Sequence, residues 1–173
     1  SSPVYRNNAG GGELIYLTGN TGLSQLGLEI LRNGLDREKF PMSVEKHLKP
    51  EPCGALIDTI LGEYCPSAMI DISDGLLVDL GHICAMSGRG FELYADKIPA
   101  HGELADFCAG KKISVTDYSL YSGEEYELLF STKKEIADDE HITYIGNITE
   151  NGYYMVSDNS RRPLELKGYD HFR

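Results

Sequence analysis

The order of apolar and polar residues in the first third of the chain predicts a strand, a helix and then a loop. Residues 13–19 (ELIYLTG) have the composition of a strand, and Gly19 ends it. In residues 21–34, leucine and isoleucine recur at helical spacing, and Gly34 follows at a position where glycine commonly ends a helix. Residues 35–52 are polar and interrupted by prolines, so we expect a loop with at most a short helix.

The middle third predicts two helices on either side of an apolar run. Residues 53–65 have an amphipathic helical pattern, and Pro66 and Ser67 separate them from the apolar run that begins at Ala68. After Asp74 the apolar residues change to helical spacing, as far as the glycines near residue 88. The change of period indicates that a buried strand passes into a helix at this point.

The last third is dominated by predicted strands. The expected elements are a strand at 91–99, a short helix at 102–110, and strands at 125–132, 141–149 and 153–167, the last a hairpin turning at 158–160. Strands and helices alternate, and strands then cluster at the end. We therefore predict one domain of the α/β (α+β) class, with a single mixed β-sheet and helices packed against it.

The composition excludes some classes of binding partner for this protein. The 173 residues include 27 acidic and 16 basic side chains, for a net charge of -11. This balance argues against nucleic acid or an anionic membrane as the main partner, because both attract clustered lysine and arginine. No apolar run is long enough to span a bilayer, and no secretory signal is evident. The four cysteines lack metal-site spacing, so we interpret them as reduced thiols of a cytoplasmic protein.

A cluster of polar residues, DISDGL (71–76), lies where the buried strand is expected to become a helix. On one interpretation, Ser73 or Asp74 is an ordinary N-cap of that helix. On the other, Asp71 and Asp74 supply the oxygen ligands that Mg²⁺ prefers. The Ser73 hydroxyl and the backbone N–H groups of the helix start would then hold a phosphate oxygen. The spacing alone leaves both interpretations open.

Two further segments carry candidate chemistry. In YSGEEYELLF (121–130), strand alternation predicts that Glu125 and Glu127 face solvent, whereas Glu124 lies at a turn that either faces a cleft or belongs to the surface. The segment GYDHF (168–172) offers Tyr169 or Phe172 for stacking on a planar ring or for attachment of the terminus to the core. Motifs of Walker-type phosphate loops, zinc proteases and serine hydrolases are absent from the sequence.

Taken together, these segments resemble the thiamine-monophosphate kinase family, of the superfamily that includes aminoimidazole ribonucleotide synthetase. The resemblance rests on MIDISDGLLVDLGHI (69–83), SGEEYELLF (122–130), YIGNIT (144–149) and GYDHF (168–172), in this order. Residues 6–31 also resemble the segment that opens the C-terminal domain of the family.

The resemblance implies transfer of the γ-phosphoryl group of ATP to thiamine monophosphate, which yields thiamine diphosphate and ADP, with several Mg²⁺ ions. It implies positioning and charge neutralisation rather than a covalent nucleophile or a dedicated base. By position, the implied roles are metal ligands for Asp71 and Asp74, ATP contacts for Arg6 and Ser73, and contacts with thiamine monophosphate for Glu124 and for Tyr169 or, in its place, Phe172.

The sequence also departs from the family pattern. Ser122 stands where the family usually has glycine, Glu125 where it usually has aspartate, and Leu23 where an acidic residue is common. The family further places an N-terminal domain, with more metal ligands and most of a homodimer contact, before the segment matched here. We therefore expect this chain to be the C-terminal half of the enzyme and to be inactive by itself.

Two other functions compete with this interpretation. One is a sibling ATP-dependent synthetase such as aminoimidazole ribonucleotide synthetase, which would use a different substrate. The other is a non-catalytic acidic domain that binds a metal or a partner protein. The latter predicts that Asp71→Asn leaves catalysis unchanged.

Overall fold

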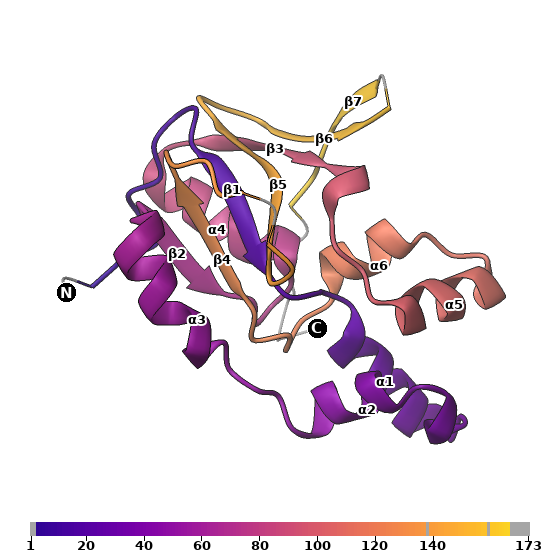
Figure 1. Ribbon diagram of the computed structural model, residues 1–173. Helices are drawn as coiled ribbons and strands as arrows, with labels where there is room; N and C mark the ends of the chain where they lie inside the picture. Colours follow the sequence, from indigo (N-terminus) through magenta and orange to yellow (C-terminus); the bar gives the residue numbers. More distant parts are fainter. Residues whose placement is uncertain (1–2, 138, 159, 167–173) are drawn as a thin grey trace.

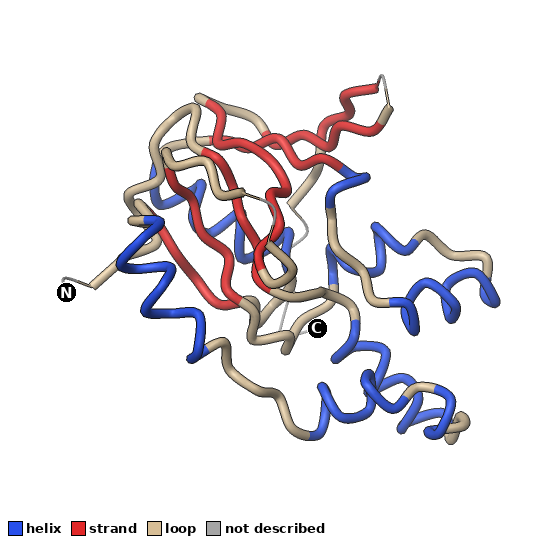
Figure 2. Tube along the Cα trace, in the orientation of Figure 1, coloured by secondary structure: helices blue, strands red, loops and turns tan. Residues whose placement is uncertain are grey.

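The computed structural model describes residues 3–137, 139–158 and 160–166, and seven strands in these ranges form one mixed sheet (Figures 1 and 2). The strand order is β2-β4-β1-β5-β3-β6-β7. Neighbouring strands are antiparallel except β3 and β6, which are parallel. The predicted single mixed sheet is thus confirmed. The strands are β1 Leu14–Thr18, β2 Ala68–Asp71, β3 Gly90–Tyr94, β4 Leu128–Thr132, β5 Ile142–Thr149, β6 Tyr153–Ser157 and β7 Ser160–Pro163.

Helices cover both faces of the sheet. On one face, α4 packs Leu77, Leu80 and Ile83 against apolar residues of β1, β3, β4, β5 and β6. On the opposite face, α3 and the π-helix η2 pack against Tyr16 and Phe130, whose rings are stacked with centroids 5.7 Å apart. Figure 1 shows these helices on either side of the strands. Their bounds are α3 Gly54–Thr59, η2 Ile60–Tyr64 and α4 Leu76–Ser87.

The remaining helices gather beyond one end of the strands, at the lower right of Figure 1. They share a second apolar core, in which the rings of Phe40 and Phe107 meet edge to face at 5.9 Å. The start of α1 lies close to the loop that leads into β4, because the N–H of Gly22 donates to Glu125 in that loop. The elements are α1 Leu23–Asn33, α2 Pro41–Leu48, α5 Gly102–Lys111 and α6 Val115–Tyr121, with the short 3₁₀ turn η1 Arg37–Lys39 before α2. A second 3₁₀ turn, η3 Ala95–Lys97, follows β3 and lies beside β5 and β6.

The predicted elements are largely confirmed, with four differences. The strand expected at 91–99 ends at Tyr94, and Ala95–Lys97 form a 3₁₀ turn instead. Pro41 occupies the first turn of α2, so it starts an eight-residue helix in a region where we expected at most a short one. The helix α6 was not predicted; the Ser114 hydroxyl caps it by accepting the Asp117 N–H at 3.1 Å. The strand expected from residue 125 begins only at Leu128.

None of the described helices has the length and apolar character needed to cross a membrane.

A glycine permits α1 and α2 to approach closely. A Cβ atom added to the buried Gly27 would lie 2.1 Å from the carbonyl oxygen of Ser43. The two backbones therefore meet at a distance that excludes any larger side chain.

We predict that Gly27→Ala lowers the free energy of unfolding by about 1–3 kcal/mol, because the methyl group must displace backbone. Urea unfolding monitored by circular dichroism measures this change. Gly110→Ala is the matched control, since a Cβ there meets no atom within 4 Å. It should leave stability unchanged or raise it by up to about 1 kcal/mol. Equal effects of the two substitutions would contradict the close approach.

Candidate functional site

Three segments that lie far apart in the sequence surround a pocket of about 310 Å³. They are the first half of α1, the turn between β2 and α4, and the segment between α6 and β4. The structure thereby brings together Ser73, Asp74 and Glu124, which the sequence had proposed as site residues. The lining comprises Ser24, Gln25, Leu28, Ser73, Asp74, Tyr121, Gly123 and Glu124.

The turn from β2 into α4 is held by a carboxylate from within the helix. Asp79, which is 1% exposed, accepts through one oxygen, Oδ2, the backbone N–H groups of Ser73 and Asp74 at 3.0 Å and of Gly75 at 3.1 Å. Burial raises the pKa of Asp79, and these hydrogen bonds oppose the rise. Asp79 thus satisfies donors that the start of α4 leaves unpaired.

This arrangement corrects two expectations. Gly75 is the N-cap of α4 and makes no side-chain cap bond, so neither Ser73 nor Asp74 caps the helix. The backbone N–H groups of this turn are already bound to Asp79, so they are not free to hold a phosphate oxygen. The physical reason is that a buried residue one turn into the helix competes for the same donors. Of the donors expected to hold a phosphate oxygen, only the Ser73 hydroxyl remains available.

The predicted metal ligands lie at the rim of this turn. Asp71 ends β2, Asp74 lines the pocket, and both side chains are exposed. No ion pair joins either carboxylate to a basic residue within the described ranges. Their oxygens are therefore available, and they fit a hard cation such as Mg²⁺.

A histidine that was not predicted, His82, also lies beside the β2–α4 turn. Ligand atoms of Asp74, Asp79 and His82 lie within 4.8 Å of one another. His82 was not among the predicted site residues, although its i, i+3 spacing from Asp79 on one helix was a usable signal. An imidazole is a poor ligand for Mg²⁺, which prefers oxygen, so His82 fits that ion less well than the carboxylates do.

The segment that carries Glu124 has an unusual backbone. Glu124 (φ 58°) and Tyr126 (φ 53°) both adopt the left-handed conformation, which is uncommon for residues other than glycine. The side chain of Glu124 is 61% exposed, and its Oε2 lies 3.9 Å from Nδ1 of His47. Two backbone hydrogen bonds join this segment to the β2–α4 turn, from Glu124 N–H to the Ser73 carbonyl at 2.8 Å and from Tyr126 N–H to the Ile72 carbonyl at 2.9 Å.

Glu125 is buried, and the prediction that it faces solvent is wrong. It is 0% exposed and accepts the N–H groups of Gly22 at 2.8 Å and Ser24 at 3.1 Å, together with the Ser122 hydroxyl. Burial raises the pKa of Glu125 to about 7, against the effect of these hydrogen bonds. Strand alternation did not apply, because the strand begins only at Leu128.

Glu127 is also buried, at 7% exposure, so the same prediction is wrong for it. Its carboxylate pairs with Lys46 Nζ at 2.6 Å and accepts the Thr18 hydroxyl at 2.7 Å and the Cys53 thiol at 2.8 Å. Burial and the bond to Glu127 raise the pKa of the Cys53 thiol. The thiol therefore stays protonated and serves as a donor.

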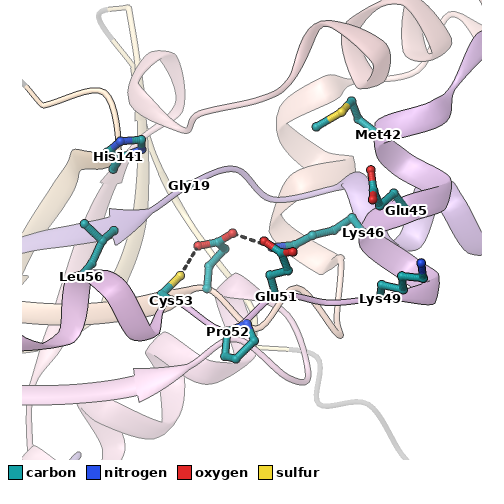
Figure 3. Close-up of a pocket in the computed structure, with 11 residues that line it drawn as sticks. Gly19, Met42, Glu45, Lys46, Lys49, Glu51, Pro52, Cys53, Leu56 and His141 are labelled. Atoms are coloured by element: carbon teal, nitrogen blue, oxygen red, sulfur yellow. Dashed lines mark hydrogen bonds and ion pairs between the residues drawn. The ribbon is translucent and has the colours of Figure 1, made fainter.

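These groups lie at a second pocket of about 500 Å³, which shares no lining residue with the first (Figure 3). Figure 3 shows Lys46 and Cys53 directed toward the same carboxylate from α2 and from the start of α3. Every polar group named in this network is satisfied within the protein. We therefore interpret it as a structural connection between β1, β4 and α2.

Arg6 is not among the residues that line the pocket. Arg6 is exposed in the segment before β1 and pairs with no described acidic residue. Tyr169 and Phe172 lie outside the described residues, so their roles stay predictions.

Comparison with known structures defines the class of protein. The chain superposes on the hydrogenase maturation protein HypE in complex with ATP with a TM-score of 0.75 and 16% identity, over 96% of this chain and 54% of that one. At this identity the likeness shows the fold alone. The fold is therefore that of the aminoimidazole ribonucleotide synthetase-like proteins.

Matches at higher identity are to thiamine-monophosphate kinases. The chain is 32% identical over 180 residues to the thiamine-monophosphate kinase of Leptospira interrogans, which covers 99% of this chain and 56% of that protein. AaThiL complexed with AMPPCP and TMP matches with a TM-score of 0.84 and 31% identity, over 98% of this chain and 54% of that one. No family model matches the chain. The chain spans about half the length of these relatives and is homologous to the C-terminal part of thiamine-monophosphate kinase.

We predict that Asp79→Asn lowers the free energy of unfolding by about 1–3 kcal/mol, because a neutral amide replaces a charged acceptor of three N–H groups. The exposed Asp106 on α5 supplies the control, Asp106→Asn. Urea unfolding of both variants measures the difference. An Asp79→Asn midpoint equal to that of Asp106→Asn would refute this role of Asp79.

The pKa of Glu125 predicts a pH dependence of stability. Because the folded state holds this proton more tightly than the unfolded chain, Glu125 favours folding at low pH and loses that contribution as pH rises. The free energy of unfolding of the wild type minus that of Glu125→Gln should fall by up to about 3 kcal/mol between roughly pH 4.5 and pH 7. Urea unfolding at several pH values tests this, and a difference that is constant with pH would contradict it.

Proposed function

We propose that this chain is the C-terminal half of a thiamine-monophosphate kinase, which transfers the γ-phosphoryl group of ATP to thiamine monophosphate and releases thiamine diphosphate and ADP. The observation that carries the proposal is the meeting of Ser73, Asp74 and Glu124 in one pocket of a chain homologous to such kinases. The complex of AaThiL with AMPPCP and TMP supports the choice of substrates.

Asp71 and Asp74 are the proposed metal ligands. Their exposed carboxylates have no basic partner in the described part of the chain, and oxygen ligands suit Mg²⁺. Bound Mg²⁺ ions would neutralise phosphate charge, which is the main requirement of phosphoryl transfer. The carboxylates at this rim would hold the ions beside the pocket.

The remaining proposed contacts divide between the two substrates. Ser73 offers its hydroxyl to ATP, since its N–H is bound to Asp79, and Arg6 provides a guanidinium for ATP phosphates. Glu124 and Tyr169 are the proposed contacts for thiamine monophosphate.

We also propose that activity requires more than these 173 residues. The matched kinases are nearly twice as long, and the pocket lining has no lysine or arginine. An N-terminal domain and a second copy of the whole protein, as a homodimer in the cytoplasm, would complete the site. The isolated chain is accordingly expected to be inactive.

The deciding experiment measures thiamine diphosphate formation from thiamine monophosphate and Mg-ATP. The samples are the natural protein that contains this chain, its Asp71→Asn variant and, as a control, Asp58→Asn at an exposed position on α3. We expect product with the wild type and the control, and a loss of at least about 100-fold, roughly 2.7 kcal/mol, in Asp71→Asn.

Other outcomes would separate the competing functions. A folded, ATP-binding wild type that forms no thiamine diphosphate would overturn the proposed reaction and favour a sibling synthetase. Full activity in Asp71→Asn would leave the reaction intact and remove the metal role of Asp71.

A further inference from the structure

We propose that Glu125 is a positioning residue for thiamine monophosphate, because its buried carboxylate fixes the Ser122–Tyr126 segment, and with it Glu124, against the start of α1. The inference rests on the proposed function, in which Glu124 contacts this substrate. Glu125 itself does not line the pocket and would act through its neighbour.

The hydrogen bonds of Glu125 connect two sides of the pocket. One carboxylate oxygen, Oε1, accepts the N–H of Gly22, the N–H of Ser24 and the hydroxyl of Ser122. Gly22 is the N-cap of α1 and has no side chain with which to cap the helix. Glu125 supplies that acceptor from across the fold. Ser24 and Glu124 both line the pocket, so this one oxygen sets the separation of the elements that carry them.

The backbone on either side of Glu125 needs such a restraint. Glu124 and Tyr126 adopt left-handed conformations that are unfavourable for their side chains. Such conformations persist where the surrounding structure determines them, as the Glu125 hydrogen bonds and the two backbone bonds to Ile72 and Ser73 do here. Loss of the carboxylate would allow this backbone to relax and Glu124 to turn away from the pocket.

The surroundings of Glu125 make its charge sensitive to pH. Its second oxygen, Oε2, is buried without a hydrogen-bond partner within the described residues. Burial places its pKa near neutrality, at about 7, and Lys46 opposes that rise. The other titratable groups around it are Tyr118, His47 and Glu124. The group that accepts the N–H groups of α1 therefore changes its protonation as pH passes through 7.

Steady-state kinetics of the full-length protein test the inference. We expect Glu125→Gln at pH 8 to raise KM for thiamine monophosphate at least about 5-fold, with kcat and KM for ATP within about 2-fold of wild type. Glu125→Asp keeps a carboxylate acceptor and should retain KM for thiamine monophosphate within about 2-fold of wild type. Glu135→Gln, at an exposed position, is the control.

A second measurement separates this inference from the proposed function. Without substrate, the backbone amide resonances of Gly22 and Ser24 should shift with pH around a midpoint near 7 in the wild type and not in Glu125→Gln. If the wild type makes no thiamine diphosphate but these amides titrate as stated, the proposed function fails and the link to α1 stands. Amides that titrate alike in both proteins, or a Glu125→Gln protein with the kinetics of Glu135→Gln, would overturn the inference.

Discussion

Backbone N–H groups at the start of a helix need hydrogen-bond acceptors. The pocket of this molecule depends on the acceptors that serve two of its helices. Neither α1 nor α4 has a capping side chain at its first residue, because a glycine occupies each N-cap. Buried carboxylates replace the caps: Glu125 serves α1 and Asp79 serves the turn before α4. Because these acceptors lie inside the protein, the side chains of Ser73, Asp74 and Glu124 are left to face the pocket.

The negative charge of the pocket means that a phosphate could bind there only with cations, or with basic residues from outside the pocket lining. Its lining contains two carboxylates and no cationic side chain. The chain as a whole carries a net charge of -11. A phosphate placed there would meet like charge in a partly desolvated setting, where repulsion is strong. Divalent cations held by Asp71 and Asp74 would reverse that sign locally, in agreement with the proposed chemistry.

Local patterns in the sequence were enough to predict most of the elements. The spacing of apolar residues identified α1, α4 and α5, and the C-terminal hairpin was evident from its turn residues. The helix α6 was missed because its seven residues include only a short apolar pattern, and its cap at Ser114 was overlooked. Ser73, Asp74 and Glu124, which only the family resemblance had grouped, line one pocket, and no local pattern could have joined them.

The burial of Glu125 and Glu127 is the most important feature that the sequence did not predict. Whether Glu125 and Glu127 face inward depends on donors about a hundred positions away, such as the N–H of Gly22 and the hydroxyl of Thr18. Periodicity within a strand carries no information on such partners. Asp79 was different, because an acidic residue within the apolar stretch of a predicted helix is itself unusual and could have been examined as a buried acceptor.

The position of β1 has a consequence for how the chain folds as it is made. This strand lies inside the sheet, and both of its neighbours, β4 and β5, come from the last third of the sequence. At a synthesis rate of about 5–20 residues per second, β1 waits on the order of ten seconds before either partner exists. The half of the chain that leaves the ribosome first therefore holds an apolar strand with unpaired edges. Until β4 and β5 have been made, only chaperones or the helices that fold beside β1 can shield it from aggregation.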